Sequence, residues 1–432
     1  MNIFKYPGED AENKVLAIIN RGLDFPQKAY QDVTDILDDV RKNGDKALIN
    51  YTRKFDSQNV TERNLVVSEG EIDAAFQSVE KECLSALDLA IFQIESFHKK
   101  QLTHSWFDTT RPGVFLGQMV NPVDAAGIYV PGAQGGKTPL VSSVLMNGIP
   151  AKIAGVGKIV MVTPPMADGC ISPYLLVAAK KVGVDLIVKA GSAWAIAALA
   201  YGTKQVPKVD VITGPGNMYV TLAKKIVAGT VGIDMIAGPS EILVIADETA
   251  NPSYMAADLL SQAEHDALAS AILVTTSREI ADQVSDAVDN QLKSLSRKNV
   301  AEKSLADYGV ILVVPDMETA ISLANKIAPE HLELQVADPF ACFGRLKNAG
   351  AIFMGQHTPE PVGDYIAGPN HVLPTAGTAR FSSALSVDNF LKKTSVIHYS
   401  EDAFRKEAGY IIRLADIEGL SAHANSVKIR LA

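Results

Sequence analysis

The sequence predicts an α/β fold in which parallel strands are covered by helices on both faces. At 432 residues the chain is too long for one simple core, so we expect two or more domains. Short apolar runs alternate with helical runs, which is typical of a parallel sheet. The strand-like runs include 127–130, 158–162, 185–189 and 209–213. The helical runs between them are 141–154, 173–182, 193–201 and 217–227.

The amino-acid composition argues against a membrane protein, a secreted protein and a nucleic-acid-binding protein. Hydrophobic residues make up 47% of the chain and the mean hydropathy is +0.10, which fits a compact soluble protein. No apolar run of about 18 residues predicts a membrane span, and the N-terminus does not resemble a secretory signal. A formal charge of -9 gives no reason to expect nucleic-acid binding. Three scattered cysteines fit a reducing compartment, so we expect a cytoplasmic protein.

Residues 1 to 102 are predicted to be mostly helical. Apolar residues recur at helical spacing in 28–54 and 70–100, with a short strand at 65–67 between them. His98 and His104 flank a polar connection without a motif partner nearby. We interpret both histidines as surface or packing residues.

The loops that follow the strands are candidate binding segments, because ligands of open parallel sheets bind at the carboxyl ends of strands. Three such loops stand out, at 131–138, 191–193 and 214–217. No GxGxxG fingerprint follows any strand. Gly214-Pro-Gly216 before a helix could let a phosphate approach backbone N–H groups, and a plain tight turn is the alternative.

The stretch from Ile233 to His265 carries the first candidate metal ligands. An apolar run at 241–246 predicts a buried strand, and Asn251 followed by Pro252 predicts a helix start. Gln262 and His265 are three residues apart and therefore project from one face of that helix. An oxygen ligand and an imidazole at this spacing can hold one metal ion. The alternative is a polar helix end that faces solvent.

The alternation resumes after His265, with strands predicted at 271–275, 310–314 and 351–354. Pro329 ends a helix just before Glu330 and His331. Successive strand residues face opposite ways, so these two side chains share a site only if the segment is a turn. The segment 363–371 is loop by composition. The tail is predicted to be a helix from 401, then 418–423, then a short strand at 426–431.

Two motifs identify a family. Asp234-Met-Ile-Ala-Gly-Pro-Ser-Glu241 and Asp258-Leu-Leu-Ser-Gln-Ala-Glu-His265 resemble the signature of histidinol dehydrogenase, and the resemblance extends from about Asp32 to the C-terminus. That family oxidises an amino alcohol to an amino acid with NAD and a zinc ion. The resemblance implies two doubly wound parallel-sheet domains of aldehyde-dehydrogenase-like topology. We expect an N-terminal helical arm at 1–25, a first domain at 26–128 with 239–382, an inserted domain at 129–238, and a C-terminal tail domain at 383–432 that contacts a partner subunit.

The resemblance also implies a zinc site. The four family ligands correspond to Gln262, His265, Asp364 and His423, with one zinc ion per subunit. Two imidazoles, an amide oxygen and a carboxylate suit zinc. The family is a homodimer with a shared active site, and the last ligand comes from the partner's C-terminal segment. By this resemblance His423 acts across the interface.

An alcohol-to-acid oxidation needs two hydride transfers and one water. The three cysteines lie outside the motif loops, so a cysteine-bound aldehyde is not expected. His331 can take the alcohol proton and Glu330 can activate the water, as the family assigns them. The resemblance implies substrate contacts by Ser240, Gln262, His265, His331, Asp364, His371, Glu418 and His423.

The resemblance places Tyr129 and Asn217 against the dinucleotide. At a third cofactor position the family reads Gly-Gly-Ala-Gln, whereas this chain reads Gly191-Ser-Ala-Trp194. We hypothesise that the Trp194 indole stacks on a cofactor ring. The loop at 133–138 is also longer than in the family pattern.

The predicted function is the oxidation of L-histidinol to L-histidine through L-histidinal with NAD, the last step of histidine biosynthesis. One alternative is a family relative that oxidises another small polar alcohol, such as a sulfonated diol, which Trp194 and the long loop keep open. The other is a metal-bound paralogue that has lost catalysis, against which the intact Glu330 and His331 count.

Overall fold

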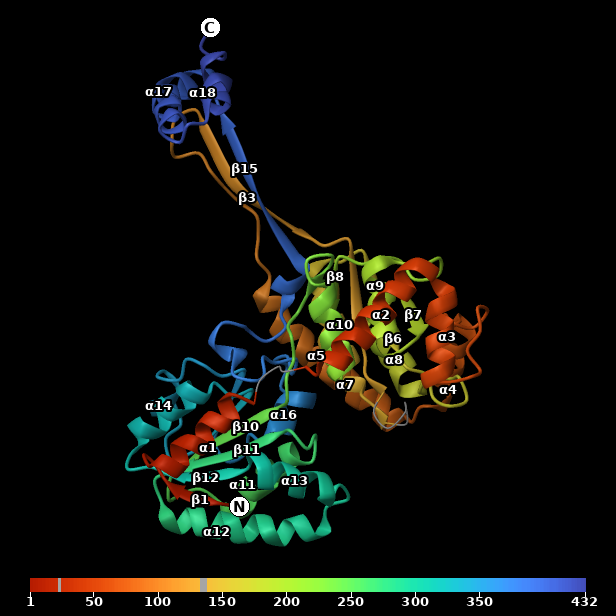
Figure 1. The fold of residues 1–432 in the computed structure, drawn as a ribbon, viewed down its shortest axis with the longest axis vertical. Coiled ribbons are helices and arrows are strands. Elements are labelled where there is room, and N and C mark those ends of the chain that lie inside the picture. The colour runs from red at the N-terminus through yellow and green to blue at the C-terminus, as the bar shows by residue number, and fades with distance from the viewer. Residues whose placement is uncertain (22–24, 133–137) are drawn as a thin grey trace. The chain divides into compact units, whose positions relative to one another are not determined.

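The computed structural model describes residues 1–21, 25–132 and 138–432, and these form two compact units (Figure 1). The first unit combines Met1–Gln101 with Asp124–Phe390, and the second combines Leu102–Val123 with Leu391–Ala432. Two separate parallel sheets lie in the first unit. The predicted α/β fold with two parallel sheets is therefore confirmed.

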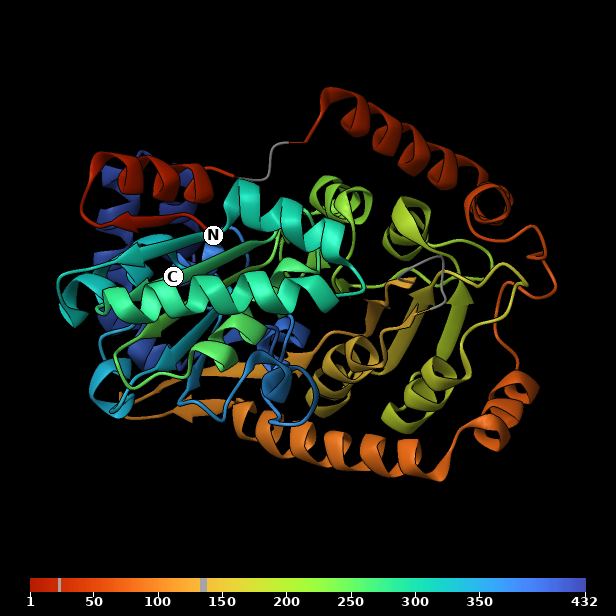
Figure 2. The same cartoon turned by 90° about the horizontal axis from the view of Figure 1, so that it is seen from below.

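The larger sheet of the first unit has six parallel strands with helices on both faces (Figure 2). Its strand order is β1 (Ile3–Lys5), β12 (Val310–Val313), β11 (Ser270–Thr275), β10 (Glu241–Ala246), β13 (His331–Gln335) and β14 (Ala351–Met354). One face packs on α1 (Glu9–Ile19) and α14 (Met317–Ile327). The other face packs on α11 (Pro252–Ala263), α12 (Arg278–Gln291) and α13 (Lys298–Tyr308).

The N-terminal segment belongs to this sheet. The sequence predicts an arm at 1–25, but β1 pairs in parallel with β12 as an edge strand. Ala11, Val15 and Ile18 of α1 are buried in the core beneath the sheet. These three positions form one apolar helix face, and burying that face in the chain's own core removes it from water. The segment up to residue 21 is thus part of the unit and does not extend from it as an arm.

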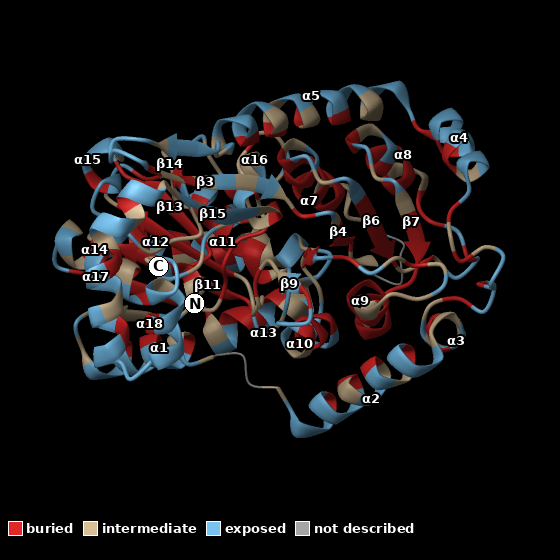
Figure 3. Cartoon of the chain, turned by 90° about the horizontal axis from the view of Figure 1, so that it is seen from above, coloured by how far each residue is buried: buried red, intermediate tan, exposed pale blue. Residues whose placement is uncertain are grey.

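The smaller sheet of the first unit has five parallel strands. Its order is β7 (Leu186–Lys189), β6 (Lys158–Thr163), β4 (Ala125–Tyr129), β8 (Val211–Thr213) and β9 (Gly232–Ile233). The helices between its strands are α7 (Val141–Ala154), α8 (Pro173–Val182), α9 (Ser192–Tyr201) and α10 (Met218–Val227). This sheet spans the segment that the sequence predicts as the inserted domain. In Figure 3 strands β4 and β6 of this sheet are buried along most of their length.

The early helices pack on this smaller sheet, which differs from the expected grouping of 26–128 with 239–382. They are α2 (Gln27–Asn43), α3 (Asp45–Phe55), α4 (Glu69–Ser78) and α5 (Lys81–His98). Val33, Leu37 and Val40 of α2 share a core with α9. Helix α9 is apolar on all sides, so it needs a cover on the face opposite its own sheet. Helices α2 and α3 supply that cover.

The second unit is a three-stranded antiparallel sheet with two helices. The sheet order is β15 (Leu391–Tyr399), β3 (Val114–Pro122) and β2 (Trp106–Asp108). The helices are α17 (Glu401–Ile417) and α18 (Ser421–Lys428). The strand predicted at 426–431 is wrong, because α18 continues through Lys428 and packs against α17, with Ala424 fully buried. Among the described helices, none combines the length and apolar composition needed to cross a bilayer.

Candidate active site

The candidate catalytic pair lies where the chain passes from helix α14 into strand β13 of the larger sheet. Helix α14 ends at Ile327, and Ala328 adopts a left-handed conformation with φ of 56° that redirects the chain. Glu330 lies in a bend directly before β13, and His331 is the first residue of the strand. Nδ1 of His331 is 3.9 Å from a carboxylate oxygen of Glu330, so the two side chains meet. Both are buried. This site lies at the amino ends of β10 and β13, unlike the binding loops at the carboxyl ends of the smaller sheet.

The hydrogen bonding of His331 fixes which ring nitrogen is free. Nδ1 lies 3.1 Å from the backbone carbonyl oxygen of Glu241. A carbonyl oxygen only accepts hydrogen bonds, so Nδ1 carries the proton and Nε2 keeps a lone pair. Burial lowers the pKa of His331, while the charge of Asp364 and the bond to Glu241 oppose that shift. The imidazole is thus set up as a neutral base with Nε2 as its accepting atom.

Glu330 is held by the start of β10. One carboxylate oxygen accepts a hydrogen bond from the Glu241 backbone N–H at 3.3 Å, and the Ser240 hydroxyl donates a second. Burial raises the pKa of Glu330 well above its usual range, although these bonds partly oppose the rise. The negative charges of Glu241 and Glu360 add to it. A carboxylate with a raised pKa is a stronger general base than an exposed one.

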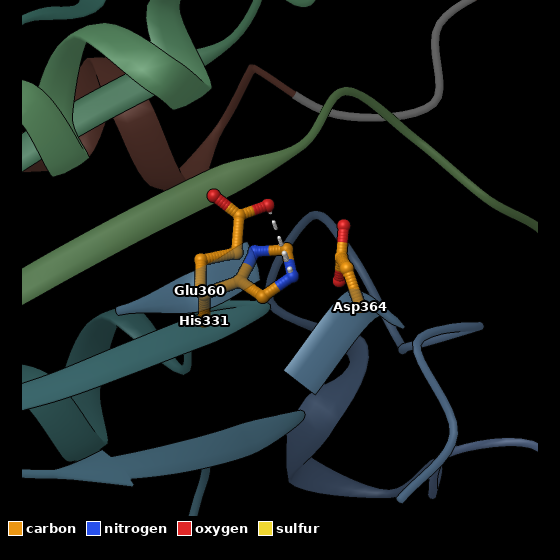
Figure 4. Close-up of side chains that lie close together, drawn as sticks. All are labelled: His331, Glu360 and Asp364. Carbon is orange, nitrogen blue, oxygen red and sulfur yellow. Dashed lines mark ion pairs between the residues drawn. The ribbon is translucent and has the colours of Figure 1, made fainter. Parts of the chain in front are cut away.

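A cluster of three potential ligands surrounds the free nitrogen of His331. Ligand atoms of His331, Glu360 and Asp364 all lie within 4.8 Å of one another (Figure 4). Nε2 of His331 is 3.7 Å from a Glu360 oxygen. Glu360 and Asp364 are one turn apart on α16 (Glu360–Tyr365). Burial raises the pKa of Asp364 to about 7, the Glu360 charge adds to the rise, and His331 opposes it.

The end of α11 carries two further predicted ligands, Gln262 and His265. Gln262 is 0% exposed, and neither its amide oxygen nor its amide nitrogen has a hydrogen-bond partner among the described residues. An unpaired buried amide costs free energy unless something binds it. His265 follows the helix and is exposed. Burial raises the pKa of Glu360, and the charge of His265 is the largest factor that opposes the rise. His265 therefore lies within electrostatic range of the cluster.

A cavity of about 310 Å³ opens beside the cluster, and Asp364 and His371 help to line it. This volume suits a small-molecule ligand. Nε2 of His371 is buried without a partner among the described residues, and burial lowers the pKa of His371 to about 4. The neighbouring Asn370 amide donates to the Met146 carbonyl oxygen at 2.6 Å and lies 3.3 Å from Nε2 of His98. His98 is fully buried and anchors this loop, which places it among the packing residues.

Two residues predicted to contact the dinucleotide lie at loops of the smaller sheet. The Tyr129 side chain is buried at the end of β4, and its hydroxyl accepts a hydrogen bond from the Ser192 N–H at 3.1 Å. Asn217 is exposed and caps α10 through its side-chain oxygen, which accepts from two backbone N–H groups. At Gly214 a Cβ atom would lie 2.1 Å from the Tyr129 carbonyl oxygen, so only glycine allows this close approach. The two loops are thus in direct contact.

Two further predicted site residues, Glu418 and His423, belong to the second unit. Glu418 is the C-cap of α17, and His423 lies in the first turn of α18. Both side chains are exposed on the single chain. Their predicted roles as substrate contact and metal ligand stay predictions.

Comparison with known proteins identifies the family. The family model for histidinol dehydrogenase matches residues 20–431. The chain belongs to the histidinol dehydrogenase family. The histidinol dehydrogenase of Desulfotalea psychrophila is 59% identical over 92% of each chain, and that of Carboxydothermus hydrogenoformans is 55% identical over 93% of this chain and 94% of its own. The crystal structure of histidinol dehydrogenase from Elizabethkingia anophelis is 40% identical, with a TM-score of 0.93 over 100% of this chain and 98% of that one. Histidinol dehydrogenases are oxidoreductases, and every predicted site residue lies inside the matched range.

Trp194, where this chain departs from the histidinol dehydrogenase pattern, lies in the hydrophobic core. The side chain is 5% exposed and stacks on Tyr51 and Phe55, with ring centroids 5.9 and 5.4 Å away. This placement contradicts the hypothesis that the indole stacks on a cofactor ring. The all-apolar helix α9 presents the indole to α3, where burial and aromatic packing stabilise it. The other departure, the 133–138 loop, lies outside the described residues except for Thr138.

The candidate site also contains residues that the sequence did not predict. Glu360 is one of the three residues of the ligand cluster. Its signal was its position four residues before Asp364, which places both on one helix face. Arg21 pairs with Glu241 behind Glu330, with an N–O distance of 2.9 Å and both side chains buried. No sequence signal links Arg21 to a strand 220 residues away.

Proposed function

We propose that this chain oxidises L-histidinol to L-histidine through L-histidinal, with two NAD molecules reduced per substrate, as the last step of histidine biosynthesis. The observation that carries the proposal is the buried pair of bases. His331 presents a free Nε2 beside Asp364, and Glu330 lies next to it with a raised pKa. Membership of the histidinol dehydrogenase family supports the substrate.

In the first half-reaction, Nε2 of His331 takes the hydroxyl proton of the alcohol. The carbinol C–H bond breaks and its hydride passes to NAD, which leaves the aldehyde, NADH and one proton on the imidazole. The Nδ1–H bond to the Glu241 carbonyl keeps the ring oriented and stabilises the imidazolium that forms. No water takes part in this step.

In the second half-reaction, Glu330 takes a proton from water while the oxygen of that water attacks the aldehyde carbon. The hydrate forms as an oxyanion, because its proton is on Glu330, and it then loses a hydride to a second NAD, which gives the carboxylic acid and a second NADH. Ser240 and the Glu241 N–H hold the carboxylate of Glu330 in place for the water. Hydrating the aldehyde is the part of the reaction that needs a second base.

The donor set fits a zinc ion. Gln262, His265 and Asp364 would hold it in the first unit, with His423 as the fourth ligand. The unpaired buried amide of Gln262 and the buried carboxylates of Glu360 and Asp364 close to His331 support this assignment. When bound, zinc would orient the nitrogen atoms of the amino alcohol and so fix the carbinol carbon.

Replacing His265 by asparagine is expected to remove zinc from the purified protein. Asparagine is a much weaker zinc ligand than imidazole. Elemental analysis should find about one zinc per chain in the wild type and a clear deficit in His265→Asn. His357→Asn is the matched control, because His357 is an exposed histidine outside the site and should leave zinc unchanged. An unchanged zinc content in His265→Asn would remove this residue from the ligand set.

We also propose a homodimer in which His423 and Glu418 complete the partner's site. Exposed apolar side chains on the second unit support an interface there. Tyr410, Leu414 and Ile417 recur at helical spacing on α17 and are 74%, 63% and 69% exposed. Such a stripe is typical of a helix that packs on a partner. Tyr129 and Asn217 would contact NAD.

A shared site predicts complementation between two inactive variants. His423→Ala and Glu330→Ala chains should each be inactive alone. In a heterodimer, the site built on the His423→Ala chain keeps its own Glu330 and gains His423 from the other chain. Subunit exchange followed by an NADH assay should therefore restore activity from one site per heterodimer. Absence of recovery after verified exchange would mean that His423 serves its own chain.

The experiment that tests the function is an NADH assay with L-histidinol beside other small polar alcohols, including a sulfonated diol. We expect the highest kcat/KM with L-histidinol. The core position of Trp194 removes one of the two features that kept the diol alternative open. A preference for the diol would support that alternative, and no NADH with any alcohol would support an inactive paralogue.

A further inference from the structure

Strand β13 carries a row of buried polar side chains behind the catalytic pair. His331, Glu333 and Gln335 alternate with Leu332 and Leu334, so the three polar groups point to one face of the sheet. Glu333 is 0% exposed and Gln335 is 1% exposed. The reaction described above uses neither of them. Fully buried charged or amide groups are rare unless they are hydrogen-bonded to one another.

Glu333 is bonded to two further elements of the site. One of its carboxyl oxygens accepts the backbone N–H of Glu360 at 3.2 Å, and the other accepts the Gln335 amide at 3.1 Å. Its carboxyl group also hydrogen-bonds Asp258 on α11. The Gln335 amide lies 3.5 Å from Asp258 as well. Glu333 thereby connects β13, α16 and α11.

We propose that Glu333 and Asp258 are positioning residues. They fix α11, α16 and β13 relative to one another and so position the predicted zinc ligands and the catalytic histidine. The bonds of Glu333 reach residues of α11 and α16 that lie one helical turn before a predicted zinc ligand. Asp258 is one helical turn before Gln262 on α11, and Glu360 is one turn before Asp364 on α16. Glu333 itself is two residues after His331 on the same face of β13. The inference rests on the proposed function, because it concerns the residues that would hold its zinc.

The chemistry of the pair explains why it is rigid. Two carboxyl groups hydrogen-bond each other only when one of them keeps its proton. Burial raises the pKa of Glu333 well above its usual range, and the Asp258 charge raises it further. Both Glu333 oxygens also accept N–H groups, one from the Glu360 backbone and one from the Gln335 amide. Buried hydrogen bonds of this kind favour a single arrangement of the elements that contribute to them.

Glutamine and alanine at position 333 give a sharp pair of variants. Glutamine at position 333 keeps an oxygen that can accept the Glu360 N–H and an amide group that can hydrogen-bond Asp258. Alanine loses both. In Glu333→Ala we expect faster amide hydrogen exchange in 360–365 and a zinc affinity about 10–100-fold lower in chelator competition, as for loss of other groups that orient metal ligands. In Glu333→Gln we expect both quantities to stay within a few-fold of the wild type. Glu318→Ala, an exposed glutamate on α14, controls for loss of charge.

Hydrogen exchange is measured on the full-length protein with and without zinc, and needs no substrate. If the wild type fails to oxidise L-histidinol, the proposed function falls while the exchange result still decides the role of Glu333. Unchanged exchange and unchanged zinc affinity in a folded Glu333→Ala protein would overturn the inference, and so would equal losses in the Gln and Ala variants. If Glu333→Ala does not fold, Asp258→Ala removes the same bond from the α11 side. It should then lower zinc affinity while Asp258→Asn lowers it less.

Discussion

Replacing Glu330 by glutamine is expected to cripple the oxidation of L-histidinal while L-histidinol is still oxidised to the aldehyde. Glutamine keeps the shape of the side chain and can still accept the Glu241 N–H and the Ser240 hydroxyl. It cannot take a proton from water. The first half-reaction needs no water, so it should be affected much less than the second.

The expected loss in the second step is about 10²–10⁴-fold, the usual effect of removing a positioned general base. The measurement is NADH release with L-histidinol and with L-histidinal supplied separately, under single-turnover conditions. Glu248→Gln, which changes a glutamate outside the site, is the control and should leave both rates unchanged. If Glu330→Gln slows both substrates equally, the carboxylate orients His331 and is not a dedicated base for water.

Replacing His331 by asparagine is expected to reduce the oxidation of L-histidinol by about 10²–10⁴-fold. The asparagine amide could still donate to the Glu241 carbonyl, which is the bond that Nδ1 makes now. It offers no basic nitrogen in place of Nε2. The loss should appear mainly in kcat, because the missing group acts on the proton that leaves in the transition state.

Steady-state kinetics of NADH formation with L-histidinol measure this effect. His357→Asn again serves as the control, since its imidazole is exposed. Zinc content should be measured in the same preparation, so that loss of a base is separated from loss of metal. A His331→Asn protein with full zinc and near-normal kcat would exclude His331 as the base.

Local sequence signals predicted most elements around the site. The apolar run at 241–246 is β10, and Asn251 caps α11 by accepting two backbone N–H groups, with Pro252 in the first turn. These features depend on residues that are close in sequence, such as a cap and the N–H groups it satisfies. Spacing and residue type are enough to predict them.

The features that were missed depend on contacts between distant segments. Asp258 and Glu333 bond across 75 positions, and Arg21 pairs with Glu241 across 220. A single sequence does not show which polar residues meet in the core. The alternation of His331, Glu333 and Gln335 along β13 did carry a signal. Polar residues at every second position of a buried strand point to one face of the sheet, where each needs a hydrogen-bond partner. Trp194 was misplaced because an aromatic side chain suits a core and a cofactor site equally well.

The most direct test of the account is the stoichiometry of the reaction in zinc-loaded and chelated protein. With zinc, each L-histidinol consumed should yield two NADH and one L-histidine, and no L-histidinal should accumulate. Chelation should abolish NADH formation, and added zinc should restore it. One NADH per substrate with L-histidinal as the product, or the full reaction in metal-free protein, would contradict the proposed site.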